Sequence, residues 1–146
     1  MPVFEQLLIK YPDKVKLVYK NYPLPSHKYA AKAAMAALAA GLQGKFWEFH
    51  DALFKNYNRL DDQKIQEIVL QLGLDETKFN QDKRSSQLAA RIRQDWEEGK
   101  QLGIRGTPTL FINGKKVKNR SIKNMEALID EQLKAGKTKE IKAAGQ

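Results

Sequence analysis

Residues 103–115 read GIRGTPTLFINGK and carry the clearest local signals in the chain. The apolar run 109–112 predicts a short strand, and Asn113-Gly114 after it is a strong signal for a hairpin turn. Pro108 lies directly before that run, a position where proline is tolerated because it lacks a backbone N–H. On these residues alone, Gly106-Thr107-Pro108 is either an ordinary turn, which turn frequencies favour, or a cis peptide that holds the backbone open for a ligand.

The composition is that of a soluble globular chain of one domain, with 146 residues of which 42% are hydrophobic. The net charge of +9 comes from 26 basic and 17 acidic residues. Because the basic residues are dispersed and no nucleic-acid motif accompanies them, we expect a solvated face and no nucleic-acid partner. The one dense basic stretch is the tail, residues 136–146.

Neither a membrane segment nor an export signal is expected in this chain. The longest apolar stretch, residues 29–42, is too short to span a bilayer and is interrupted by Lys32. The first residues carry Glu5 and Gln6, where a signal peptide needs an unbroken apolar core. We therefore expect no membrane partner.

The absence of cysteine excludes disulfides, thiolate nucleophiles and thiolate metal sites. The two histidines, His27 and His50, are too few for a histidine-based zinc site, and each is expected to have a structural role. No Ser-His-Asp set, phosphate-binding loop or GxGxxG motif is present. The sequence therefore predicts no catalytic residue, no metal and no cofactor.

Hydrophobic periodicity predicts a chain rich in helices with few strands. Alternation over residues 14–22 predicts a strand, with Pro23 and Pro25 closing it, and Ser26 is expected to cap the next helix. Helical spacing predicts helices over residues 3–11, 27–42, 45–57, 61–73, 75–79, 86–102 and 121–135. The predicted order is a helix, a strand, five helices, a β-hairpin and a final helix.

These pieces together resemble the DsbA family of thiol-disulfide oxidoreductases, over nearly all of the chain. Residues 15–54 are similar to the family's strand, proline turn and the start of its inserted helical domain, and residues 103–115 to its cis-proline loop and hairpin. The resemblance implies an α/β thioredoxin-like fold with an inserted helical domain. It divides the single domain into thioredoxin parts at about 1–25 and 103–135, a helical insertion at about 26–102, and the basic tail 136–146.

The resemblance also implies a substrate-binding site at Gly106, Thr107 and Pro108. The Thr107-Pro108 bond is expected to be cis, with the backbone at Thr107 pairing with extended polypeptide substrates. Trp47 and Trp96 are two further candidates for the border of a substrate groove, although a core role is the simpler expectation for Trp96.

The departure from the family is equally specific. The family's Cys-x-x-Cys and the strand before it have no counterpart in this chain, which begins within the helix that follows them. Without a thiolate there is no thiol exchange. The missing strand is the usual central one, so its loss would leave apolar strand edges unpaired. We expect the two strands to close up, another chain to pair with them in a homodimer, or the native protein to begin upstream.

Two functions from different classes follow. The first is a DsbA-family oxidoreductase domain, truncated or redox-inactive for lack of cysteine. The second is a module that binds peptides or proteins at the cis-proline loop. A third option is a related enzyme on the same fold that uses glutathione. The resemblance implies a periplasmic or other extracytoplasmic location, while the lack of an export signal leaves the cytoplasm open.

Overall fold

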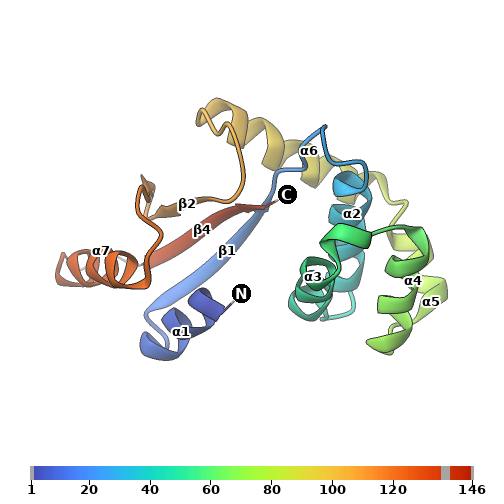
Figure 1. Cartoon of the computed structure of the whole chain (residues 1–146), viewed down its shortest axis with the longest axis horizontal. Coiled ribbons are helices and arrows are strands. Elements are labelled where there is room, and N and C mark those ends of the chain that lie inside the picture. The colour runs from blue at the N-terminus through green and yellow to red at the C-terminus, as the bar shows by residue number, and fades with distance from the viewer. Residues whose placement is uncertain (1, 136–138, 146) are drawn as a thin grey trace. The chain divides into compact units, whose positions relative to one another are not determined.

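The computed structural model describes residues 2–135 and 139–145 of the chain. It separates into two compact units, which we call the sheet unit (residues 1–20 and 99–145) and the helical unit (residues 21–98). The elements, labelled in Figure 1, are α1 (Pro2–Lys10), β1 (Val15–Asn21), α2 (Ala30–Gly41), α3 (Phe46–Lys55), the short 3-10 helix η1 (Tyr57–Arg59), α4 (Asp62–Gln71), α5 (Glu76–Asp82), α6 (Ser86–Gln101), β2 (Thr109–Ile112), β3 (Lys115–Lys116), α7 (Ile122–Lys134) and β4 (Lys139–Gly145).

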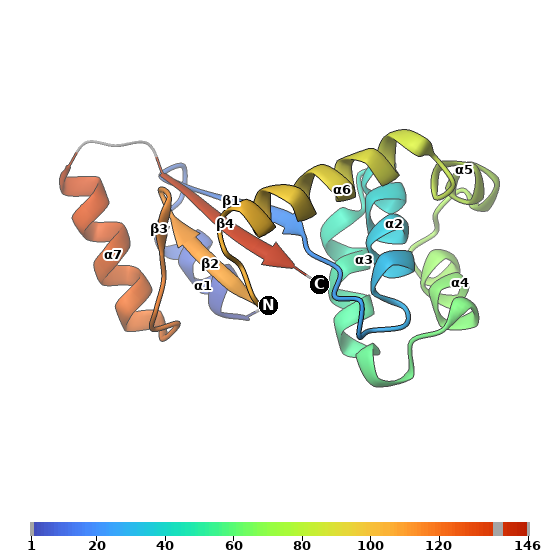
Figure 2. The ribbon, with the colours of Figure 1, turned by 90° about the horizontal axis from the view of Figure 1, so that it is seen from above.

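The sheet has four strands in the order β1-β4-β2-β3. Strands β2 and β3 form the predicted hairpin, with Phe111 opposite Lys116. Gly114, in the turn, has a positive φ of 80°, a conformation that glycine adopts without steric cost. Strand β4 pairs antiparallel with β2, with Thr109 opposite Ala144 and Ile112 opposite Ile141. Figure 2 shows β4 lying between β1 and β2.

The position of β4 corrects two expectations. Residues 139–145 of the basic tail, predicted to be a solvated face, form a strand inside the sheet, while residues 136–138 and 146 of that tail lie outside the described residues. The gap between the first strand and the hairpin is filled by the chain's own C-terminal segment, an outcome that none of the three expectations included. The homodimer stays a prediction, but this sheet is complete without one.

The core of the sheet unit lies between the sheet and two helices on one of its faces. Leu7 of α1, Leu110 and Ile112 of β2, and Met125 and Ile129 of α7 are all buried there in one cluster. The alternation of β2 explains this arrangement, because residues two apart in a strand point to the same face. Burying one such aliphatic side chain contributes about 1.5–3 kcal/mol.

A polar contact fastens the two helices of this unit to each other. The hydroxyl of Tyr11, at the end of α1, donates a hydrogen bond to Oδ1 of Asp130 in α7 at 2.8 Å. Burial, followed by that hydrogen bond, raises the pKa of Tyr11 to about 12. Lys10 forms an ion pair with Glu126, one turn earlier in α7, at 2.9 Å.

The helical unit has a separate core. The small side chains of α2 allow close helix packing, and Ala39 and Ala40 are fully buried. Phe49 of α3 and Phe79 of α5 are also fully buried, with ring centroids 5.6 Å apart. The helix predicted over residues 45–57 is shorter than expected, because α3 ends at Lys55 and Tyr57, in η1, has a side chain that is 71% exposed.

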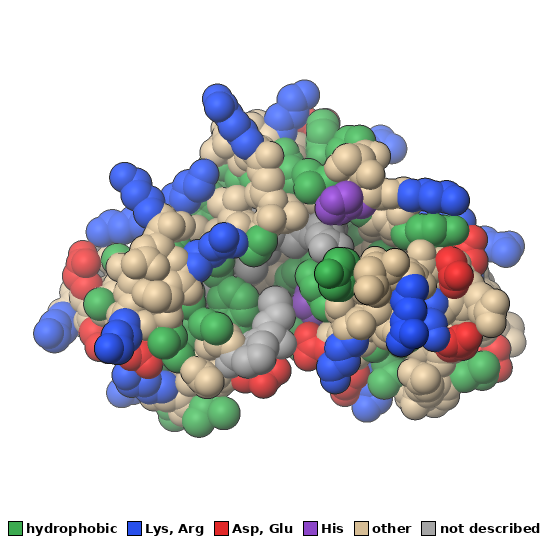
Figure 3. Space-filling model, in the orientation of Figure 1, with side chains coloured by type: hydrophobic (Ala, Val, Ile, Leu, Met, Phe, Trp, Pro, Cys, Tyr) green, Lys and Arg blue, Asp and Glu red, His purple; other side chains and the backbone are tan. Residues whose placement is uncertain are grey.

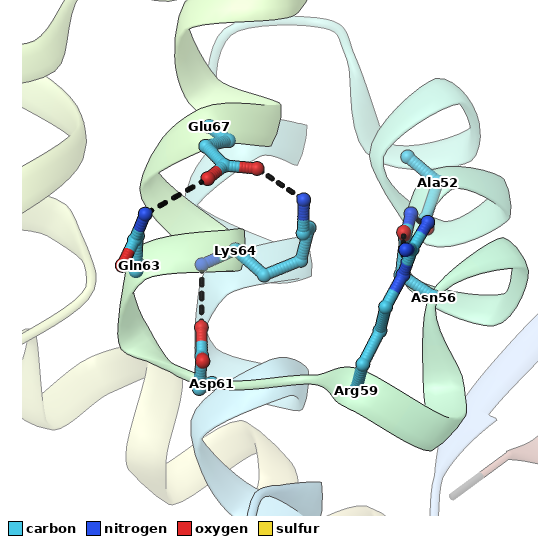
Figure 4. A network of polar contacts seen from close by, with 7 residues as sticks. All are labelled: Ala52, Asn56, Arg59, Asp61, Gln63, Lys64 and Glu67. Atoms are coloured by element: carbon cyan, nitrogen blue, oxygen red, sulfur yellow. Dashed lines mark hydrogen bonds and ion pairs between the residues drawn. The ribbon is translucent and has the colours of Figure 1, made fainter.

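Capping and short-range polar contacts define the ends of these helices, as Figure 4 shows around α4. Asp61 caps α4 by accepting a hydrogen bond from the Lys64 amide at 2.7 Å, and Asp75 caps α5 in the same way. The prediction that Ser26 caps α2 is wrong, since the helix starts at Ala30 after Tyr29, which makes no side-chain cap. Within Figure 4, Lys64 and Gln63 both contact Glu67.

None of the described helices is both long enough and apolar enough to cross a membrane.

Candidate functional site

The candidate site is the loop that connects α6 to β2. Ile104 anchors its start in the core, with 6% of the side chain exposed. Thr107 is half-buried and Pro108 is exposed, and the peptide bond between them is cis. The next two residues, Thr109 and Leu110, are buried in β2. The structure therefore presents Thr107 and Pro108 at the surface, directly before a strand that is held in the sheet.

Two hydrogen bonds brace this loop on either side of Thr107. The hydroxyl of Thr109 donates to the carbonyl oxygen of Gly106 at 2.7 Å, and Nη1 of Arg120 donates to the carbonyl oxygen of Pro108 at 3.2 Å. Within the described residues, the backbone N–H and C=O of Thr107 have no hydrogen-bond partner. The loop thus has a fixed conformation and one residue with both backbone groups available for an extended chain.

The sequence analysis named Gly106, Thr107 and Pro108 as the site, which stays a prediction, and did not include Arg120. A signal for it does exist. The amide of Val117 donates to the carbonyl of Leu110 at 2.8 Å, which continues the register of the hairpin beyond β3. If this register continues, Pro108 lies opposite residue 119, next to Arg120. A two-residue turn at Asn113-Gly114 sets the same register, so the sequence already indicated that residues 119 and 120 lie near the loop.

The other residues considered from the sequence lie in the helical unit. His50 is buried, with Nδ1 3.1 Å from Oδ1 of Asp51. Burial lowers the pKa of His50, and the hydrogen bond to Asp51 opposes that effect. The imidazole packs among aromatic rings, 5.7 Å from Trp47 and 4.5 Å from Phe54 between centroids. These contacts give His50 a structural role in the core.

The two tryptophans and His27 occupy different environments. Trp47 is 40% exposed, whereas Trp96 is half-buried and stacks on Tyr22 with a centroid distance of 6.1 Å. His27 is exposed in the turn before α2. Next to the Trp96 stack, buried Asp95 accepts a hydrogen bond from the Asn21 amide at 2.9 Å, a contact that the sequence alone did not indicate.

No described part of the chain brings three or more His, Cys, Asp or Glu side chains together in a group that could hold a metal ion. The site residues that the structure does bring together are a threonine, a proline, a glycine and an arginine. Such a set can bind a polypeptide through backbone hydrogen bonds and charge, but it contains no nucleophile activated by a neighbouring base.

The two units differ sharply in charge. The segments 1–20 and 99–145 contain 15 Lys or Arg and six Asp or Glu, while residues 21–98 contain 11 of each. On the face drawn in Figure 3, acidic side chains of the helical unit lie among its basic ones. The whole net charge of the chain therefore belongs to the unit that carries the candidate loop.

Comparisons with known proteins agree with this fold. A family model described as Thioredoxin matches residues 2–131. The thiol-disulfide exchange protein alpha-DsbA2 from Wolbachia pipientis superposes with a TM-score of 0.80 and 26% identity, covering 90% of this chain and 72% of that one. A thioredoxin-like oxidoreductase from Silicibacter pomeroyi gives a TM-score of 0.75 and 26% identity, covering 91% and 78%.

The curated relatives are much longer proteins. The chain is 36% identical over 128 residues to Na(+)/H(+) antiporter NhaA 3 of Salinispora tropica and 37% identical over 105 residues to Na(+)/H(+) antiporter NhaA 1 of Mycolicibacterium vanbaalenii. The two matches include 87% and 70% of this chain. The chain spans only 19% and 17% of the length of the two antiporters. Their antiport is therefore not carried over to this chain.

Proposed function

Because the chain belongs to the thioredoxin family and is similar to its DsbA-type members, we propose that it is a polypeptide-binding thioredoxin-fold domain without redox activity of its own. The binding site is the loop at Gly106, Thr107 and Pro108. An extended polypeptide segment lies against this loop and exchanges backbone hydrogen bonds with Thr107, as an added strand does at a sheet edge.

The observation that carries this proposal is the absence of hydrogen-bond partners for the Thr107 backbone among the described residues. The bonds from Thr109 to Gly106 and from Arg120 to Pro108 fix the backbone on both sides. A rigid loop loses little conformational freedom when a partner binds, which favours affinity.

The lack of cysteine supports the second half of the proposal. Thiol exchange proceeds by attack of a thiolate on a disulfide, and this chain has no sulfur atom able to do so. With its own residues the chain neither oxidises nor reduces a disulfide. The extracytoplasmic location that the resemblance implied stays a prediction.

The test is binding of a fluorescent nonapeptide of serine, threonine and valine, measured by anisotropy, to three forms of the chain. Thr107→Pro removes the N–H at the site, so binding should be lost. Thr107→Val has nearly the same side-chain shape and leaves the backbone donor in place, so it is the matched control and should bind like the wild type. The same peptide with N-methylated backbone amides should also fail to bind. Equal binding by Thr107→Pro and Thr107→Val would contradict the proposal.

A further inference from the structure

The candidate loop lies in the middle of the most one-sided stretch of charge in the chain. Residues 99–125 contain seven Lys or Arg and no Asp or Glu. Three of these cations, Arg105, Lys118 and Arg120, flank the loop in sequence or in the hairpin register, and all three are exposed. Such a local excess of one charge sign attracts ligands of the opposite sign.

The described residues supply no counter-charge to these three cations. In the described part of the chain, none of them has a carboxylate within ion-pair distance. Elsewhere the pattern is different. Lys32, Lys45, Lys64 and Lys78 of the helical unit each pair with an Asp or Glu. Within the described residues, the charge of Arg105, Lys118 and Arg120 is therefore available to a ligand at the loop.

Arg120 connects this charge to the site itself. Its Nη1 lies 3.2 Å from the carbonyl oxygen of Pro108, the residue after Thr107. A guanidinium has five N–H donors in a planar arrangement and remains charged at all ordinary pH values. One donor serves the loop, and a carboxylate beside Thr107 would be within the field of this exposed group.

We propose that the loop prefers extended polypeptide segments that carry Asp or Glu next to the residue paired with Thr107. This inference rests on the proposed function and adds the class of segment that is bound. The backbone of Thr107 supplies affinity for any extended chain, and Arg105, Lys118 and Arg120 supply the preference for acidic side chains. A nucleic acid or an anionic membrane would use the charge but not the free backbone groups of Thr107.

The experiment compares two nonapeptides by anisotropy, the neutral one described above and one with two glutamates flanking its central residue. We expect the acidic peptide to bind about three- to tenfold more tightly at low salt, the size expected for two partly exposed charge contacts. The preference should disappear at 1 M salt because the screening length is then only about 3 Å.

The variant Arg105→Gln/Arg120→Gln should lose the preference for the acidic peptide. Because Arg120 also braces the loop, the variant Arg105→Gln/Lys118→Gln provides a second test that leaves the bond to Pro108 intact. The matched control is Lys14→Gln/Lys134→Gln, which removes the same charge from exposed positions directly before β1 and at the C-terminal end of α7. It should keep the preference.

The outcomes separate the two proposals. Loss of the preference in both loop variants but not in the control supports the inference. Equal binding of the two peptides overturns it and leaves the proposed function standing. Failure of both peptides to bind overturns both proposals. Tighter binding of a single-stranded oligonucleotide or of anionic vesicles than of the acidic peptide, lost in the loop variants, overturns the acidic-polypeptide inference in favour of those ligands.

Discussion

The helical unit and the sheet unit differ in the continuity of their chain segments and in their net charge. The helical unit is one continuous segment, residues 21–98, in which 11 basic and 11 acidic residues balance, and four of its lysines form ion pairs with Asp or Glu. The sheet unit joins two segments that are far apart in the sequence and carries the whole net charge. A unit with no net charge attracts a charged partner only weakly. The sheet unit has an excess of positive charge and a loop in which the Thr107 backbone has no hydrogen-bond partner among the described residues. This difference supports the proposal that the binding site lies in the sheet unit.

The largest expected effect tests whether the two cores are independent. Phe49→Ala removes a fully buried ring that packs on Phe79 in the helical unit, and should lower the free energy of unfolding by about 3–5 kcal/mol. Hydrogen exchange should show the loss of protection confined to residues 21–98. Equal loss of protection in β2 and α7 would mean that the units unfold together and that the comparison fails.

A variant that ends at Ala135 tests the sheet unit in the same manner. Without β4, strand β2 keeps β3 on one side but loses its pairing with β4 over residues 109–112. Because these backbone hydrogen bonds are removed, the free energy of unfolding of the unit should fall by about 2–4 kcal/mol. Exchange of the β2 amides should accelerate, and sedimentation should reveal association through the opened strands. Unchanged β2 protection in a monomer would show that β4 contributes little to the sheet.

At alkaline pH the sheet unit should weaken first. The pKa of Tyr11 is raised from 10.0 to about 12 in the folded state, so the unfolded state loses its proton first as the pH rises. The stabilisation by neutral Tyr11 is complete below pH 10 and is lost between pH 10 and 12. Urea unfolding followed across this range should show the decline, and Tyr11→Phe should flatten it. An identical decline in Tyr11→Phe would assign it to other groups.

At acid pH the helical unit should weaken instead, by a smaller amount. Burial lowers the pKa of His50, so below the ordinary value of 6.5 the unfolded state binds a proton that the folded state does not. Stability is therefore fully present above that value and declines as the pH falls below it. His50→Phe, compared with His27→Phe at the exposed position, should remove the decline, as measured by unfolding between pH 7 and 5. A decline of equal size in both variants would contradict the assignment.

Much of the fold was predictable because the signals were local. Asp61, Asp75 and Ser121 were expected to begin helices, and each accepts a hydrogen bond from the amide three residues on. The hairpin followed from Asn113-Gly114. Signals of this kind depend on a few neighbouring residues, so one sequence is enough to read them.

What escaped prediction depends on distant segments. Residues 139–145 contain Lys139, Glu140 and Lys142, and their composition favours a solvated tail over a strand. Pairing with β2 overrides that local preference, as strand propensity depends strongly on context. The contact of Asp95 with Asn21 and that of Arg120 with Pro108 likewise join residues that no short-range pattern connects.

The place of β4 has a consequence for the order in which the protein is made. Its residues are synthesised after those of β1 and β2, yet they pair with β2 and lie beside β1 inside the sheet. The helical unit can fold while synthesis continues, because all of its residues precede Gly99. Strands β1 and β2 have exposed edges until β4 has been synthesised, so a chaperone that shields strand edges has its greatest value in that interval.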